Sequence, residues 1–255
     1  MKMKLSLKLA ASNEYQVFCN GNFTAYGPMR SAHHYSHVRT YKLSPDENGC
    51  VCAVVIVCGA QINSFDRVNE PPFFAAELFS DEKIIARSSD FKTYRLTDRL
   101  QKVQRYSFQR TFTESYKLTE DREALLKGCE SPFPAVCTEQ TEGNTLLSDG
   151  GLSEPDYHFV GGVAIESGYA FTDPERKVIR DRSLTGIGCA PSFMRFPLEE
   201  LEEILVDEAG KIVCRPDDQK TGSRLTDGRY IAYDLGKNTS GFFRFSVTVY
   251  RKTTL

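Results

Sequence analysis

The sequence lacks the short motifs that identify the common enzyme classes. It contains no Walker loop, no G-x-G-x-x-G, no G-x-S-x-G and no H-E-x-x-H, the signatures of phosphate loops, dinucleotide sites, serine nucleophiles and zinc hydrolases. No run approaches the roughly 20 apolar residues of a membrane-spanning helix. Residues 1–11 alternate basic and apolar side chains and lack the continuous apolar core of a signal peptide. We therefore expect a cytoplasmic protein with no membrane partner.

The eight cysteines lack the spacing of a zinc finger, because the Cys-x-Cys pair has no second pair to complete it. Cys50, Cys52 and Cys58 lie in the run CVCAVVIVC, where strand alternation puts all three on one face and four apolar residues on the other. Apolar residues on both faces are typical of a central strand covered on both sides. We expect these thiols to be reduced, buried and without a metal ligand.

Alternation and turn residues predict many strands. Residues 4–9 alternate lysine or serine with leucine, and residues 37–43 form another strand. Residues 15–19 and 23–26 flank Asn20-Gly21-Asn22, a hairpin signal because Asn and Gly tolerate positive φ. At the end of the chain, residues 242–252 alternate phenylalanine and valine with polar residues. This last strand should bury Phe243 and Phe245 and expose Arg244.

Three segments predict helices. Pro71-Pro72 should begin a short helix that runs to Phe79, because proline favours a first helical turn. Residues 119–128 have an acidic first turn and a final glycine. Residues 197–209 carry a stripe of leucines at helical spacing, which should pack on a sheet.

Together these segments predict an α+β protein. The expected fold is strand-rich, with a largely antiparallel sheet or two and three or four short helices, and a ferredoxin-like arrangement would fit it. A hydrophobic content of 40% with 26% charged residues is that of a globular protein. We expect one domain over 1–255, or two lobes that meet near the apolar-poor loop 138–155.

The net charge of −2 conceals a segregation of charge. Residues 1–45 hold six basic side chains and one acidic side chain, whereas residues 119–160 hold nine acidic and two basic ones. A nearly neutral chain can therefore still present a basic face to a polyanion.

Residues 29–42, MRSAHHYSHVRTYK, combine histidine, tyrosine and basic residues without an acid. Basic side chains neutralise phosphates, tyrosine stacks on unpaired bases, and histidine can act as a general acid or base in RNA cleavage without a metal. The candidate phosphate and base contacts here are Arg30, Tyr35, Arg39 and Lys42, and the candidate catalytic residues are His33 and His37.

Two other interpretations of residues 29–42 stay open. One is a metal site built from His37 with His33 or His34 and a distant ligand such as His158, although no carboxylate lies nearby in the sequence and the arginines would repel a cation. The other is an ordinary solvated surface whose histidines have no special role. We expect neither a metal nor another cofactor.

A second basic run, residues 99–110, interleaves basic and aromatic residues in the same way. This composition is typical of surfaces that bind single strands. An exposed edge strand that uses charge to avoid aggregation would look similar. The nucleic-acid contacts predicted from this run are Arg99, Lys102, Arg105 and Tyr106.

The basic first strand, the Tyr/His/Arg-rich segment and the late strand bracketed by Gly236 and Gly241 resemble the RNA-binding repeat-associated proteins of CRISPR systems. The resemblance implies ferredoxin-like domains, guide-RNA binding, a place in a ribonucleoprotein complex of antiviral defence and, in some members, endoribonuclease activity. It also adds Arg244 to the expected RNA contacts and Tyr26, just upstream of residues 29–42, to the candidate catalytic residues. The family's glycine-rich signature is not matched in spacing.

The sequence therefore favours an RNA-binding subunit of a ribonucleoprotein assembly, and leaves open whether it cleaves RNA. The alternative is a non-catalytic structural or interaction subunit of a phage or bacterial assembly. Both hypotheses include protein subunits as partners.

Overall fold

The computed structural model divides the chain into two compact units, which are described separately. The N-terminal unit comprises Met1–Tyr157 and Val178–Ala209, and the C-terminal unit comprises His158–Lys177 and Gly210–Leu255. The residues that the structure describes are 4–29, 31–32, 34–59, 71–103, 115–118, 122–128, 130–140, 146–149, 155–180, 200, 202, 208–217, 225–226 and 228–250.

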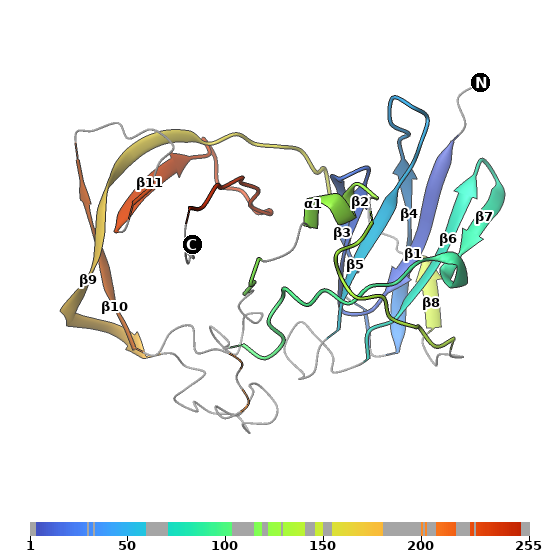
Figure 1. Cartoon of the computed structure of the whole chain (residues 1–255), viewed down its shortest axis with the longest axis horizontal. Helices are drawn as coiled ribbons and strands as arrows, with labels where there is room; N and C mark the ends of the chain where they lie inside the picture. The colour runs from blue at the N-terminus through green and yellow to red at the C-terminus, as the bar shows by residue number, and fades with distance from the viewer. Residues whose placement is uncertain are drawn as a thin grey trace. The chain divides into compact units, whose positions relative to one another are not determined.

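The N-terminal unit contains two sheets (Figure 1). The five-stranded sheet has the order β7-β6-β1-β4-β8, and the three-stranded sheet has the order β3-β2-β5. All neighbours are antiparallel except β4 and β8, which are parallel. The elements are β1 (Leu5–Ala11), β2 (Glu14–Cys19), β3 (Asn22–Gly27), β4 (Tyr35–Leu43), β5 (Ala53–Cys58), β6 (Phe74–Ser80), β7 (Lys83–Arg87), the 3-10 turn η1 (Ser88–Asp90), α1 (Arg122–Leu126) and β8 (Leu146–Asp149).

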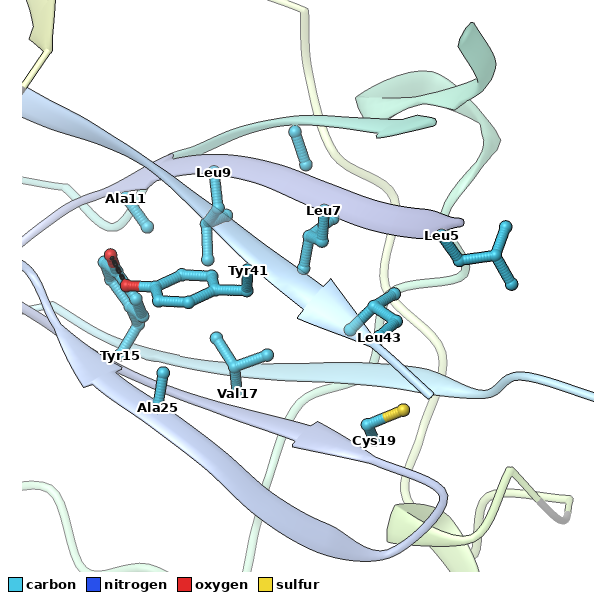
Figure 2. Packing of buried hydrophobic residues seen from close by; sticks show 11 residues of the cluster. Leu5, Leu7, Leu9, Ala11, Tyr15, Val17, Cys19, Ala25, Tyr41 and Leu43 are labelled. Atoms are coloured by element: carbon cyan, nitrogen blue, oxygen red, sulfur yellow. Dashed lines mark hydrogen bonds between the residues drawn. The ribbon is translucent and has the colours of Figure 1, made fainter. Parts of the chain in front are cut away.

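The hydrophobic core lies between these two sheets. Figure 2 shows side chains of β1 and β4 pointing toward those of β2 and β3. Alternation produces this core, because every second residue of β1 from Leu5 to Ala11 faces inward, whereas Ser6 and Lys8 between them face outward. The buried cluster consists of Leu5, Leu7, Leu9, Ala11, Tyr15, Val17, Cys19, Ala25, Tyr41, Leu43 and Ala76.

The chain passes from one sheet to the other at Ser12. The Ser12 hydroxyl accepts a hydrogen bond from the Phe73 amide at 2.9 Å, and the Ser12 amide donates to the Phe73 carbonyl at 3.0 Å. The predicted hairpin follows: Asn20 and Gly21 join β2 to β3 with φ of 49° and 80°. The sequence prediction of positive φ at this turn is confirmed.

The predicted α+β class is wrong for the part of the chain that the structure describes. That part is nearly all-β, with one short helix and one 3-10 turn, so it does not have the three or four helices or the ferredoxin-like arrangement that we expected. The expected strand-rich, largely antiparallel character does agree with the sheets.

The largest error is the helix predicted for residues 71–79. Most of this segment lies in strand β6 instead. β6 pairs along its whole length with β1, from Ala11 opposite Phe74 to Leu5 opposite Ser80. Its Ala, Glu and Leu residues have high intrinsic helix propensity. The hydrogen bonds to β1 and the burial of Ala76 in the core outweigh that preference.

The other two predicted helices have different outcomes. Residues 119–128 contain the short helix α1, which lies against β5. Most of the predicted helix 197–209, including its leucine stripe, lies outside the described residues, and its last two residues begin strand β10 (Glu208–Pro216).

Strand β5 corrects the expectation for the cysteines. Cys50 is exposed and Cys52 and Cys58 are half-buried, and none of these three thiols is in a disulfide bond. Among the described strands, β5 pairs with β2 alone, so it lies at the edge of its sheet and not at the centre. Its residues are half-buried on both faces. The inner valines pack on the core, and Gly128 after α1 approaches Cys52 on the outer side.

The C-terminal unit contains one sheet of three strands in the order β10-β9-β11. Its members are β9 (Val163–Arg180), β10 and β11 (Arg229–Asp234). β9 and β11 are antiparallel, with Tyr230 opposite Gly168. Gly168 is required by close packing, because a Cβ there would lie 2.8 Å from the Cα of Pro216.

The predicted C-terminal strand is not part of this sheet. Residues 242–249 have no regular secondary structure, and Phe243, which we expected to be buried, is 89% exposed. Phe245, Val247 and Val249 are exposed as well. The alternation of apolar and polar residues predicts an apolar face for this segment, but no described residue covers that face.

Candidate nucleic-acid interface

Three lysines of the basic N-terminal region converge on the outer face of the five-stranded sheet. Ser6 of β1 lies opposite Lys42 of β4, and Lys8 lies opposite Thr40. Lys42 is therefore a diagonal neighbour of both Lys4 and Lys8, at a typical separation of about 7–8 Å between diagonal residues of adjacent strands. All three lysines are exposed. We call Lys4, Lys8 and Lys42 the lysine triad.

The surrounding residues supply little negative charge to this triad. Glu77 of β6 lies opposite Lys8, but its ion pair is with Arg87 of β7, at 3.7 Å from Nε to Oε1. Asp81 lies at the end of the strand, where its carboxylate accepts a hydrogen bond from the Lys4 backbone amide at 3.2 Å. The ammonium groups of Lys8 and Lys42 make no ion pair within the described part of the chain.

The same face carries apolar side chains beside the lysines. Phe79 lies opposite Ser6, which separates Lys4 from Lys8, and it is half-buried. Ile85 of β7 is 51% exposed. A basic surface with exposed apolar groups can contact both the phosphates and the bases of a flexible strand.

Arg39, the arginine expected to bind phosphate, does not lie on this face. It is only 9% exposed and has the same parity as the core residues Tyr41 and Leu43. A guanidinium buried this deeply is not presented to a polyanion. Among the other β4 candidates, Tyr35 is exposed, His37 is half-buried, and Lys42 belongs to the lysine triad.

The two sheets do not bring the described catalytic candidates, Tyr26 and His37, together on one strand or one sheet. Tyr26 belongs to β3, where its neighbour Ala25 faces the core, so the Tyr26 ring is on the outer side of the three-stranded sheet. His37 belongs to β4 in the other sheet. His33 and Arg30 lie outside the described residues.

The second basic run is engaged in contacts within the protein. The Arg99 guanidinium donates to the Cys58 thiol and lies 6.0 Å from the centre of the Tyr116 ring. The Lys102 ammonium pairs with Glu200 at 2.6 Å. Arg105 and Tyr106 lie outside the described residues. Both basic residues in the described part of the run, Arg99 and Lys102, therefore have partners within the protein.

A buried ion pair stabilises the surroundings of Arg99. Nε of Arg122 lies 2.7 Å from Oδ2 of Asp98, although these two atoms are not aligned for a hydrogen bond, and a terminal guanidinium nitrogen donates to Oδ1 at 3.2 Å. Arg122 also stacks on Tyr116, 4.5 Å from the ring centre. We assign this cluster a structural role, because a buried carboxylate without its partner would be costly.

Arg244 belongs to the C-terminal unit, where its guanidinium lies 5.9 Å from the centre of the Phe159 ring. In the same unit, Nε2 of His158 lies 3.5 Å from the Lys237 ammonium. Among the described residues, no three His, Cys, Asp or Glu side chains are grouped as a metal would require. Nor does any described helix have the length and apolar character needed to cross a membrane.

The sequence prediction included Lys42 but missed Lys4 and Lys8 as site residues. The alternation of residues 4–9 already put both lysines on the face opposite the leucines. The missing information was the register that brings Lys42 between them.

Comparisons with protein-family models, with curated proteins and with solved structures found no match. The resemblance to CRISPR repeat-associated proteins therefore stays a prediction.

Proposed function

We propose that this protein binds single-stranded nucleic acid, with RNA as the expected ligand, on the outer face of its five-stranded sheet. The observation that carries the proposal is the lysine triad, which gathers positive charge from β1 and β4 on one exposed surface. The bound phosphates would replace counterions at these ammonium groups, so that binding is driven largely by counterion release.

The charge balance of this surface supports the proposal. Like charges on adjacent strands repel one another, and this repulsion persists here because Glu77, the residue opposite Lys8, is paired with Arg87. A polyanion relieves the repulsion at every lysine of the triad at once. Phe79 and Ile85 offer apolar contact to unstacked bases.

The proposal concerns binding and not cleavage. General acid-base cleavage of RNA requires its two groups within reach of one ribose and one phosphate. Tyr26 and His37, the two candidates within the described residues, belong to different sheets. The protein would therefore act as a binding subunit of its assembly.

The test is fluorescence anisotropy with a labelled, unstructured oligouridine over a series of salt concentrations. Lys8→Gln and Lys42→Gln should each weaken binding and lower the slope of log affinity against log salt by about 0.7. The variant with all three lysines replaced should lower the slope by about 2. Lys127→Gln is the matched control, since Lys127 is an exposed lysine that pairs with Glu123 within α1 at 2.8 Å.

Two results would contradict the proposal. One is an affinity and salt slope of the triple variant equal to those of the parent. The other is an equal loss in the Lys127→Gln control, which would show that net charge and not this face determines binding. A single-stranded DNA of the same length, measured in parallel, reports whether the 2′-hydroxyl contributes.

A further inference from the structure

The C-terminal unit stacks arginines on aromatic rings unusually often for its size. The Arg229 guanidinium lies 4.6 Å from the centre of the Tyr169 ring, and the Arg215 guanidinium lies 4.8 Å from the centre of the Phe171 ring. The Arg244 guanidinium makes the third pair of this kind. Proteins contain roughly one significant pair per 70–80 residues, and the whole C-terminal unit is shorter than that.

Two of these pairs share β9 and one face of its sheet. Tyr169 and Phe171 are two residues apart on β9, so their side chains point to the same face. Arg229 of β11 lies directly opposite Tyr169, before the pairing shifts register farther along the strands. Arg215 reaches Phe171 from β10, on the other side of β9. We call Tyr169, Phe171, Arg215 and Arg229 the stacking face.

Both rings of the stacking face stay open to solvent although each carries a guanidinium. Tyr169 is 51% exposed and Phe171 is 40% exposed. An aromatic ring has two faces, so a guanidinium on one face leaves the other for a second planar group. The exposed area of the two rings is therefore available for such a contact.

Asp217 holds the Arg229 guanidinium in place on its ring. A terminal nitrogen of Arg229 lies 2.6 Å from Oδ2 of Asp217, and the arginine side chain is only 8% exposed. The other oxygen of the carboxylate, Oδ1, accepts a hydrogen bond from the Ser167 hydroxyl at 3.4 Å. Because the stack is already positioned before a ligand arrives, binding orders few additional side chains.

Arg215 adds positive charge beside the rings. Its side chain is exposed, and within the described part of the C-terminal unit no carboxylate forms an ion pair with it. Two carboxylates of this unit are engaged elsewhere, Asp217 by Arg229 and Glu166 by the Tyr230 hydroxyl. A nucleotide supplies both complementary groups, a base for the rings and a phosphate for the guanidinium.

We propose that the stacking face is a second binding site for single-stranded nucleic acid, with one base on Tyr169, the next on Phe171 and a phosphate at Arg215. Two residues of a strand span about 6.8 Å. This is twice the roughly 3.4 Å per nucleotide of a stacked strand, so it suits an extended strand whose bases are separated by protein rings. The site belongs to the C-terminal unit and does not rest on the lysine triad.

The first test uses the fact that the chain contains no tryptophan. Tyr169→Trp and Phe171→Trp each introduce a single indole into the stacking face, and a base that stacks on an indole quenches its fluorescence. Titration with the oligouridine should therefore quench both variants. Tyr250→Trp is the matched control and should not respond, since Tyr250 is exposed in the same unit but has no arginine on its ring among the described contacts. Absence of quenching in the first two variants would overturn the proposal.

The second test separates stacking from charge. Tyr169→Ala should weaken binding of the oligouridine by about 5- to 100-fold, the effect of one lost stack, and leave the salt slope unchanged. Tyr169→Phe should bind like the parent, and Arg215→Gln should lower the slope by about 0.7. These affinities are measured with all three triad lysines replaced by glutamine, so that only the stacking face contributes. The tryptophan variants keep a ring on each arginine and test the face even if Tyr169→Ala fails to fold.

Two controls distinguish this site from the lysine triad and from general attraction to polyanions. Quenching of Tyr169→Trp should persist when the triad lysines are replaced, and quenching that disappears with them would show that the stacking face is no separate site. Polyglutamate, a polyanion without bases, should leave the fluorescence unchanged. Equal quenching by polyglutamate would overturn base stacking. Binding of the oligouridine without any quenching would leave the triad as the site and overturn this inference alone.

Discussion

The hydroxyl oxygens of Tyr15 and Tyr41 lie 2.7 Å apart and form a hydrogen bond that joins the two sheets of the N-terminal unit. Tyr15 comes from β2 and Tyr41 from β4, and their rings meet edge to face with centres 6.3 Å apart. Both side chains are buried, so the bond forms in a medium of low polarity, where it fixes the position of one sheet on the other.

Removing either hydroxyl should destabilise the protein. Tyr15→Phe and Tyr41→Phe should each lower the free energy of unfolding by about 0.5–1.5 kcal/mol, the usual net value of one hydrogen bond. The double variant should cost less than the sum of the two, because both substitutions remove the same bond. Chemical denaturation of the four proteins measures this coupling, and strictly additive losses would argue against a direct bond.

Gly27→Ala should also be destabilising. A Cβ at Gly27 would lie 2.5 Å from the hydroxyl oxygen of Tyr15, whose ring crosses the glycine and has no room to move in the core. We expect a loss of about 1–3 kcal/mol, as for other overpacked cores. Gly161→Ala is the control, since nothing lies within 4 Å of its added methyl group. Equal midpoints of denaturation for the two variants would refute the packing argument.

Tyr230 should ionise at a higher pH than an ordinary tyrosine. Its hydroxyl donates to the Glu166 carboxylate at 2.5 Å, and this bond, together with burial, raises the pKa of Tyr230 from 10.0 to about 12. Because the folded-state pKa lies above the unfolded value, the stabilisation is complete below pH 10 and is lost as the pH rises through 12.

The measurement is the tyrosinate absorbance during an alkaline titration. Tyr230→Phe should remove a component that titrates near pH 12. Glu166→Gln should move that component toward ordinary tyrosine, since the acceptor is then neutral. An unchanged titration curve in both variants would contradict the hydrogen bond.

The thiols should differ in their reactivity toward an alkylating reagent. Cys50, Cys137 and Cys214 are exposed and should react first, whereas Cys19 is buried and its thiol donates to the Ser44 carbonyl at 3.4 Å. Brief alkylation followed by peptide mass spectrometry gives the extent at each site. Labelling of Cys19 in the folded protein as fast as Cys50 would show that this end of the core opens readily.

The strands of the N-terminal unit were largely predictable, because their signals are local. The alternation of β1 and the Asn20-Gly21 turn act over a few residues and agree with the structure. The segment that forms β6 was not predictable in the same way. Its helix-forming residues become a strand only because β1, far away in the sequence, pairs with it.

The candidate site was predictable only in part, for a related reason. We expected Arg39 at the surface because it is charged. The alternation of β4 indicates instead that Arg39 faces inward, as Tyr41 does. The lysine triad depends on the register of β1 against β4, which no local pattern contains. The exposure of Phe243 and Phe245 was missed because alternation shows which residues share a face and not what covers them.

The place of β1 in its sheet has a consequence for folding. Although β1 precedes both of its neighbours in the sequence, it lies in the middle of the five-stranded sheet, with Leu7 opposite both Tyr41 and Leu78. During synthesis it therefore keeps an open edge until β6 has left the ribosome. Closing such a long loop slows folding, and the waiting strand is exposed to other chains in the meantime. Lys4 and Lys8, which alternate with its leucines on the outer face, would then protect the nascent chain from aggregation before they meet any ligand.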